Sequence, residues 1–269
     1  MPAVREAVVD GVFYPAVPAA LRAQVVDCLA GVSDAVHDGG RTPKVLIAPH
    51  AGYEYSGVVA AHAYALLGAR REPIVRRVVL LGPAHRVAVG GLAAPDAEAF
   101  ETPLGEVALD LAALAGLADL PQVIRSDRAH AQEHSLEVQL PFLQMQLGSF
   151  TLAPLVVGDA DAEAVAQVLE RLWGGDETLI VISSDLSHYL RYEQARAADQ
   201  GTVQRILTLD AGLGPREACG AAAINGALLA ARRHRLAPRL LALCNSGDTA
   251  GDRDRVVGYG AIAFEEAPR

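Results

Sequence analysis

The sequence predicts a single α/β domain with a mostly parallel or mixed central sheet that is flanked by helices. Short, continuous apolar runs alternate with longer stretches of helical spacing, which is the pattern of β–α units. Hydrophobic residues make up 51% of the 269 residues and charged residues 20%, which indicates a sizeable buried core. No stretch rich in Pro, Gly or Ser divides the chain and no repeat recurs at a fixed period, so we expect residues 1–269 to form one domain.

The first elements are assigned from spacing and boundaries. Apolar residues at helical spacing predict an amphipathic helix over 18–32. Residues 44–50 are apolar without alternation, so this strand is expected to be buried on both faces, as in a sheet covered by helices. An Ala-rich helix over 56–69 completes a first strand–loop–helix unit.

The same order of elements continues to the end of the chain. Further strands are predicted over 75–85, 150–158, 178–188, 238–247 and 256–266, and further helices over 134–147, 160–173, 192–209 and 219–236. The fold is therefore expected to close on a strand.

Charge and cysteine content exclude several classes of function. The formal net charge of −9 argues against binding to nucleic acid or to an anionic membrane, because both need clustered Lys and Arg. No apolar run reaches the length of a spanning helix and the N-terminus does not resemble an export signal, so a cytoplasmic protein is expected. Cys28, Cys219 and Cys244 form an odd set without regular spacing, which a reducing compartment permits.

Three predicted strands end in a short polar segment that contains a histidine, at His50, His85 and His188. The carboxyl ends of strands line the ligand crevice in open α/β sheets, so these side chains are expected to converge. A single histidine in this position is most often structural, but three in the same position favour a site. Neutral imidazole is a common ligand of Zn, Fe and Cu, and the pattern therefore predicts a site for a divalent metal ion.

Three further residues allow more than one interpretation. His134 at a helix N-terminus is either a neutral hydrogen-bond donor to substrate or a capping residue. Asp185 is a partner of a ligand imidazole, a metal ligand or a helix cap. Cys219 opens a small-residue helix whose dipole would lower its thiol pKa and favour the thiolate, or it is a small buried apolar residue.

The remaining histidines and cysteines are assigned to the surface or the core. His37, His130 and His234 have polar or charged neighbours in the sequence and are predicted to lie at the surface, whereas His62 lies mid-helix among alanines and is predicted to pack. Cys28 in a helix and Cys244 in a strand are predicted to lie in the core.

Nearly the whole chain resembles the Memo family, whose bacterial members are called AmmeMemoRadiSam system protein B. The resemblance rests on motifs in the family's order: GVFYP, APHAGYEYSG, LLGPAHR, TPLGEV, EHSLEVQLPFL, LVVGD, SSDLSHY, ACG and NSGDTAGDRDRVVGYGA. It implies a fold similar to that of the class III extradiol ring-cleaving dioxygenases, which bind non-haem Fe(II) through two histidines and a carboxylate.

The resemblance also implies a set of metal ligands. Carried over by motif, these are His50, His85 and Cys219, with Asp185 and His188 beside them. Many relatives have a proline two positions after the Cys-Gly pair, whereas this chain reads CGAAAI. A thiolate ligand favours Cu(I) or Zn and is compatible with Fe(II). Iron or copper is the expected cofactor, with zinc as the alternative.

Three functions are consistent with these residues. The first is an iron- or copper-dependent oxidoreductase, similar to an oxygenase, in which His188 acts as acid or base while Asp185 and His134 orient ligands. The second is a metal carrier or an adaptor that binds a peptide without turnover, in line with the signalling role of animal relatives. The third is a zinc-dependent hydrolase. The occupant of the pocket is expected to be a small molecule or a peptide, and the family name implies a pathway link to a radical S-adenosylmethionine protein.

Overall fold

A mixed sheet forms the centre of the computed structural model, which describes residues 3–32, 42–68 and 75–266. The strand order is β10-β12-β2-β9-β3-β8-β4-β7, and β11 also pairs with β12. Four inner strands run parallel to one another: β2 (Val45–Ala48), β9 (Thr178–Ser183), β3 (Arg77–Pro83) and β8 (Thr151–Val157). The prediction of an α/β domain with a mixed sheet is confirmed.

Antiparallel pairs extend this parallel centre on both sides. On one side β12 (Val256–Glu266) pairs with β2 and also with β10 (His188–Leu190) and β11 (Leu236–Asn245). On the other side β4 (Leu92–Ala94) pairs with β8, and β7 (Val123–Arg125) runs parallel to β4. A second, small sheet contains β1 (Val4–Arg5), β5 (Ala99–Thr102) and β6 (Gly105–Ala108).

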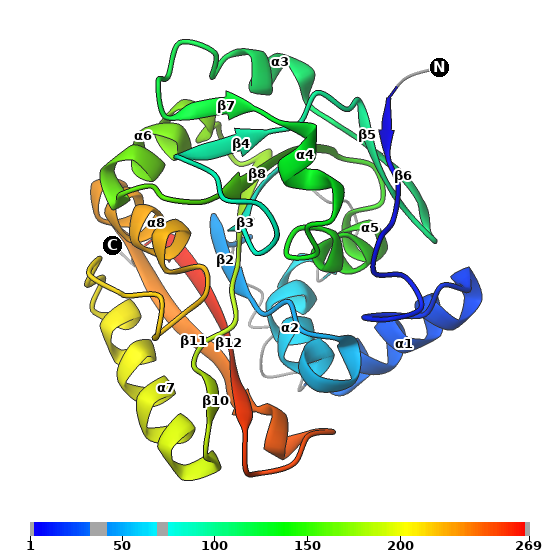
Figure 1. Ribbon diagram of the computed structural model, residues 1–269, viewed down its shortest axis with the longest axis vertical. Coiled ribbons are helices and arrows are strands. Elements are labelled where there is room, and N and C mark those ends of the chain that lie inside the picture. The colour runs from blue at the N-terminus through cyan, green and yellow to red at the C-terminus, as the bar shows by residue number, and fades with distance from the viewer. Residues whose placement is uncertain (1–2, 33–41, 69–74, 267–269) are drawn as a thin grey trace.

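Helices cover both faces of the large sheet (Figure 1). One face carries α6 (Ala162–Leu172), α7 (Tyr192–Leu207) and α8 (Ala221–Arg233), and the other carries α1 (Pro18–Ala30), α2 (Tyr53–Gly68) and α5 (Leu140–Leu147). The connections contain α3 (Leu111–Ala115), α4 (Asp127–Ala131) and the 3₁₀ turns Glu137–Gln139 and Ser246–Asp248. In the described parts of the chain, no helix is both long and apolar enough to cross a membrane.

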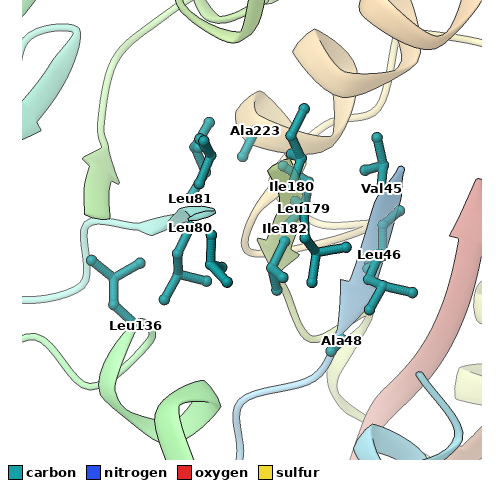
Figure 2. Close-up of a cluster of buried hydrophobic side chains, with 14 of the residues drawn as sticks. Val45, Leu46, Ala48, Leu80, Leu81, Leu136, Leu179, Ile180, Ile182 and Ala223 are labelled. Carbon is teal, nitrogen blue, oxygen red and sulfur yellow. The ribbon is translucent and has the colours of Figure 1, made fainter. Parts of the chain in front are cut away.

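The core lies on both sides of the central strands, as Figure 2 shows. Leu46, Leu80 and Ile180 come from three adjacent strands and are fully shielded from solvent. Leu136 packs near one end of this cluster, and Ala223 approaches from α8. Each large aliphatic side chain buried in this way contributes about 1.5–3 kcal/mol, which explains why the strand sequences are apolar without alternation.

One predicted helix begins later than its apolar pattern indicates. The helix predicted over 134–147 starts with one 3₁₀ turn, and α5 itself begins at Leu140. Pro141 lies in the first turn of α5, where the backbone N–H groups have no acceptor within the helix, so the missing N–H of proline costs no hydrogen bond. His134 therefore precedes the helix instead of starting it.

The prediction that His130 lies at the surface is wrong. Its side chain is 1% exposed, Nε2–H donates to the carbonyl oxygen of Ala93 at 2.9 Å, and Phe100 packs edge-on against the ring. The polar sequence of α4 hides this because only one side of so short a helix faces solvent. His234 is exposed and Cys28 is buried, as predicted, while Cys244 is only partly buried. The prediction for His37 falls outside the described residues.

Burial of His130 makes the fold sensitive to acid. Burial lowers its pKa from 6.5 to about 4, so between these values the unfolded chain binds a proton that the folded chain does not. Above pH 6.5 we expect His130 to leave the pH dependence of stability unchanged. As the pH falls from 6.5 to 4, it should lower the free energy of unfolding progressively, by about 3 kcal/mol in total. Urea unfolding at pH 7 and pH 4 measures this loss, which should be smaller in His130→Gln and unchanged in the exposed control His234→Gln. An equal loss in His130→Gln and the wild type would contradict it.

Candidate metal centre

Three imidazoles meet at the carboxyl ends of the central strands. His50 follows β2, His85 follows β3, and His134 lies in the segment after α4. One ring nitrogen from each histidine lies within 4.8 Å of the other two. The rings of His85 and His134 stack with their centroids 4.7 Å apart, and the rings of His50 and His85 meet edge-on with their centroids 5.2 Å apart. Strands β2, β9 and β3 are adjacent and parallel, so their carboxyl ends, with His50 and His85, lie at the same edge of the sheet.

Hydrogen bonds fix the tautomer of His50. Its Nδ1 lies 2.8 Å from the hydroxyl of Ser183, and that hydroxyl donates its single proton to the carbonyl oxygen of Ser135 at 2.6 Å. Nδ1 of His50 must therefore carry a proton and donate it to Ser183, which also accepts from Nε2 of Gln139 at 2.7 Å. The lone pair of His50 is therefore on Nε2, which lies 3.3 Å from Sγ of Cys219 and is the nitrogen that can bind a cation.

A buried carboxylate fixes His85 in the same way. Oε1 of Glu133 accepts from Nδ1 of His85 at 2.9 Å, and Oε2 accepts from the backbone N–H of His85 at 2.6 Å. Burial alone would raise the pKa of Glu133, but the hydrogen bonds from His85 and from the N–H of Ser135 outweigh it and lower that pKa to about 2. An ionised carboxylate can only accept, so His85 also offers Nε2.

Burial favours the neutral form, which metal ions require, in two histidines of the cluster, His50 and His134. Burial, together with the neighbouring imidazoles, lowers the pKa of His50 well below its usual value. Burial lowers the pKa of His134 to about 4 against the opposing charge of Glu133. Nδ1 of His134 is buried without a hydrogen-bond partner among the described residues, 3.4 Å from Oε1 of Glu133. A buried, unpaired nitrogen among neutral imidazoles fits the donor set of a divalent metal ion.

A glycine lets the segment that carries His134 pack against the sheet. A Cβ atom on Gly82 of β3 would lie 2.7 Å from the hydroxyl of Ser135 and 2.9 Å from the side chain of Leu136. Only glycine gives the room for the hydroxyl of Ser135 to reach the carbonyl oxygen of Pro83 at 3.0 Å. This contact places His134 opposite the strand ends.

Cys219 lies beside His50, with Sγ 3.3 Å from Nε2. The expectation of a lowered thiol pKa is wrong, because burial and the charge of Asp185 raise that pKa to about 12. Cys219 precedes Gly220, the N-cap of α8, so the helix begins two residues after the cysteine. The effect of the helix dipole on the thiol pKa is therefore smaller than that of burial and of Asp185. In the absence of a cation the thiol is protonated, and its role as a metal ligand stays a prediction.

Asp185 and His188 take positions next to the cluster. Asp185 is buried and accepts from the backbone N–H of His50 at 2.8 Å. Burial raises its pKa to about 6, although the bond from His50 opposes the rise. His188 is half-buried at the start of β10 and donates Nδ1–H to the carbonyl oxygen of Leu186 at 2.8 Å. The three-histidine group thus contains His134 where the strand-end pattern predicted His188.

Three residues that hold the ligands were not identified from the sequence: Glu133, Gln139 and Ser183. Gln139 is completely buried, accepts from the hydroxyl of Tyr64 at 2.6 Å and donates to the carbonyl oxygen of Pro49 at 2.9 Å. A polar residue inside the apolar run LEVQLPFL was the signal available for it. No comparable signal marked Glu133 or Ser183, because their roles depend on contacts with residues distant in the sequence.

A cavity of about 400 Å³ adjoins Cys219. Its walls come from the ends of β3 and β8 and from the first turn of α8, including Pro83, Val157 and Ala222. Small side chains on α8 keep this space open. The lining includes Cys219 but none of the three histidines, so this space adjoins the cysteine and not the imidazoles.

Replacing Glu133 with glutamine is expected to weaken metal binding. The amide keeps one acceptor oxygen, so it cannot bind both the ring and the backbone of His85. Loss of such a supporting carboxylate lowers metal affinity about 10- to 100-fold. A chelator competition with Zn²⁺ measures the dissociation constant, and the exposed variant Glu106→Gln is the control. An unchanged constant in Glu133→Gln would show that this carboxylate does not support the site.

The fold and the three-histidine cluster at the carboxyl ends of its central strands define a candidate metalloprotein of the α/β class. A family model described as Memo-like protein matches residues 5–263. The chain belongs to the Memo family.

Several relatives match along almost their full length. A MEMO1 family protein of Methanopyrus kandleri is 36% identical over 282 residues, covering 97% of this chain and 98% of the relative. A MEMO1 family protein of Aeropyrum pernix is 36% identical over 280 residues, covering 94% of this chain and 96% of the relative. The crystal structure of an uncharacterised protein from Escherichia coli K12 matches with a TM-score of 0.51 and 14% identity, over 83% of this chain and 100% of that one. This last similarity concerns the fold alone.

Proposed function

We propose that this protein is a metal-dependent oxidoreductase, similar to an oxygenase, that uses iron or copper held by His50, His85 and Cys219. The observation that carries the proposal is the pair of histidines whose Nδ1 protons are already given to Ser183 and Glu133. Nε2 of His50 and Nε2 of His85 therefore each carry a lone pair that can bind a cation. The sulfur of Cys219, 3.3 Å from Nε2 of His50, supports its place as the third ligand.

The residues around these ligands divide the remaining tasks. A bound iron or copper ion would supply the redox chemistry and the open coordination positions. Asp185 holds the backbone of His50, and Glu133 holds the ring of His85. His188 donates through Nδ1, so its Nε2 is free to take up or release a proton near the centre. His134 faces the ligands and is suited to orient substrate.

The site is closed on one side and open on the other. His50 is 2% exposed, whereas the side chain of His85 is 28% exposed. A molecule from solvent therefore reaches the centre from the side of His85. A centre with an accessible face supports turnover over a purely structural role.

Metal content is the decisive measurement. The protein would be purified anaerobically without a metal-binding tag and analysed by mass spectrometry, together with His50→Ala, His85→Ala, Cys219→Ala and the surface control His234→Ala. Stoichiometric iron or copper that is lost in the three site variants, with circular dichroism unchanged, would support the proposal. Oxygen uptake with candidate substrates would follow. No metal under any loading condition would overturn it.

A zinc-dependent hydrolase is the second candidate. Its supporting observation is the group of His50, His85 and His134, because three imidazoles with an open face are a typical ligand set of catalytic zinc. Stoichiometric zinc that is lost in His134→Ala and kept in Cys219→Ala would favour this function. A metal that exchanges freely and supports no reaction would instead favour a carrier or adaptor.

A further inference from the structure

Tyr189 has a backbone conformation that its place in the fold does not require. Its φ is 60°, in the left-handed region, where a residue with a Cβ atom is disfavoured about 5- to 30-fold relative to glycine. Among the described residues, Leu209 and Arg235 are the other non-glycine residues with a positive φ. Each of these two follows the C-cap of a helix, α7 or α8, where a left-handed residue closes the last turn. Tyr189 lies inside a strand, β10, so its conformation needs a different reason.

The strand is irregular at Tyr189, and the irregularity brings its side chain against His188. The register between β10 and β12 shifts between His188 and Leu190, as it does at a β-bulge. Side chains that are neighbours in a regular strand point to opposite faces of the sheet. The rings of His188 and Tyr189 instead meet edge-on, with their centroids 5.7 Å apart and their planes at 74°. The local backbone thus produces an aromatic contact between adjacent residues.

Burial of the tyrosine ring does not explain why this conformation is kept. Tyr189 is 63% exposed, so its ring adds little to the apolar area that the fold removes from water. Arg255 holds the ring from another side, with its guanidinium 5.0 Å from the ring centroid. Backbone strain persists only where the surrounding structure enforces it, and residues with such strain concentrate at functional sites.

His188 is the residue that benefits from the contact. Its Nδ1–H donates to the carbonyl oxygen of Leu186 at 2.8 Å, and its ring has no other hydrogen bond among the described residues. A half-buried imidazole with one hydrogen bond can still turn about its side-chain bonds. The edge of a neighbouring aromatic ring restricts this movement.

We infer that Tyr189 is a positioning residue, which keeps the imidazole of His188 in one orientation through the contact between the two rings. The inference deepens the proposed function and rests on its assignment of His188 as acid or base. Tyr189 has its ring contacts with His188 and Arg255, so its role concerns the orientation of His188 and not the binding of the metal ion.

The first part of the test measures the backbone strain. Tyr189→Gly and Tyr189→Ala both remove the ring, but only glycine relieves the left-handed φ. In urea unfolding, the folding equilibrium constant of Tyr189→Gly should be about 5- to 30-fold larger than that of Tyr189→Ala. The exposed pair Arg235→Gly and Arg235→Ala is the control and should differ by a similar factor. Equal constants for the two Tyr189 variants would overturn the inference, because the backbone would then not be strained.

The second part measures the orientation of His188 in metal-free protein that carries ¹³C-labelled histidine. NMR relaxation gives an order parameter for each ring, and His234, which stacks on Trp173, is the internal control. The order parameter of His188 should fall from about 0.85 to below about 0.6 in Tyr189→Gly and Tyr189→Ala. Tyr189→Phe keeps the ring and should restore the wild-type value. Unchanged order of His188 in Tyr189→Gly and Tyr189→Ala would overturn the inference.

Metal content separates this inference from the proposed function. Tyr189→Ala should hold as much metal as the wild type, since the variant leaves His50, His85 and Cys219 intact. If the wild type holds no metal, the proposed function fails, and the ring order in metal-free protein still decides whether Tyr189 positions His188. If metal binds and the ring order of His188 does not depend on Tyr189, the inference fails while the metal site stands.

Discussion

Replacing Glu137 with alanine is expected to lower the free energy of unfolding by about 3–5 kcal/mol. Glu137 is fully buried and accepts from the guanidinium of Arg5, from the hydroxyl of Tyr14 at 2.5 Å and from the backbone N–H groups of Val8 and Val9 at 3.0 Å. Its removal leaves the buried charge of Arg5 without a counter-ion and several donors without an acceptor. Leaving such groups unpaired costs more than the lost contacts themselves.

Urea unfolding near neutral pH measures this loss. The matched control is Glu163→Ala, which breaks the exposed ion pair with Arg233 and should cost less than about 1 kcal/mol. The double variant Arg5→Leu with Glu137→Leu removes both charges together and should be more stable than Glu137→Ala. Equal stability of Glu137→Ala and Glu163→Ala would contradict the importance of this network.

Replacing His50 with alanine is expected to weaken metal binding by about 100-fold or more. Binding free energies of about 10–16 kcal/mol for a four-ligand zinc site correspond to roughly 3 kcal/mol for each ligand. His50 is the most buried histidine of the cluster, so solvent cannot easily supply a substitute ligand. The measurement is a chelator competition with Zn²⁺ on protein whose fold is checked by circular dichroism.

His188→Ala is the matched control for His50→Ala. Both histidines follow the same pattern in the sequence and both donate through Nδ1, but only His50 belongs to the three-histidine group. Affinity should therefore fall in His50→Ala and change little in His188→Ala. The reverse order would show that the cation binds elsewhere in the crevice.

The order of strands and helices was predictable because buried parallel strands carry unbroken apolar runs. The short strands between 92 and 125 were not predicted, since they are three or four residues long and their pairing partners lie elsewhere in the chain. Leu92, for example, pairs with Val157. Such segments become strands through long-range contacts that local spacing does not encode.

Part of the candidate site was also predictable. His50 and His85 each directly follow an apolar strand, and the carboxyl ends of parallel strands lie at one edge of a sheet, so their proximity could be expected from the sequence. In the structure only one strand separates the two that they follow. His134 joins them through the approach of its segment to Gly82, a contact that no local pattern announces. The same holds for Glu133 and Ser183, whose hydrogen bonds decide which ring nitrogens are free.

Arg5 joins the N-terminal strand to the segment that carries His134. Besides its bond to Glu137, it donates to the backbone carbonyl oxygens of His130 at 3.1 Å and Glu133 at 2.6 Å. Local opening of the N-terminal strand would therefore release the backbone on which the cluster depends. Binding of a cation and closure of this strand are thermodynamically linked, and each must strengthen the other by the same factor. Slower amide exchange near Val8 and Val9 would then report occupancy of a centre that these residues do not touch.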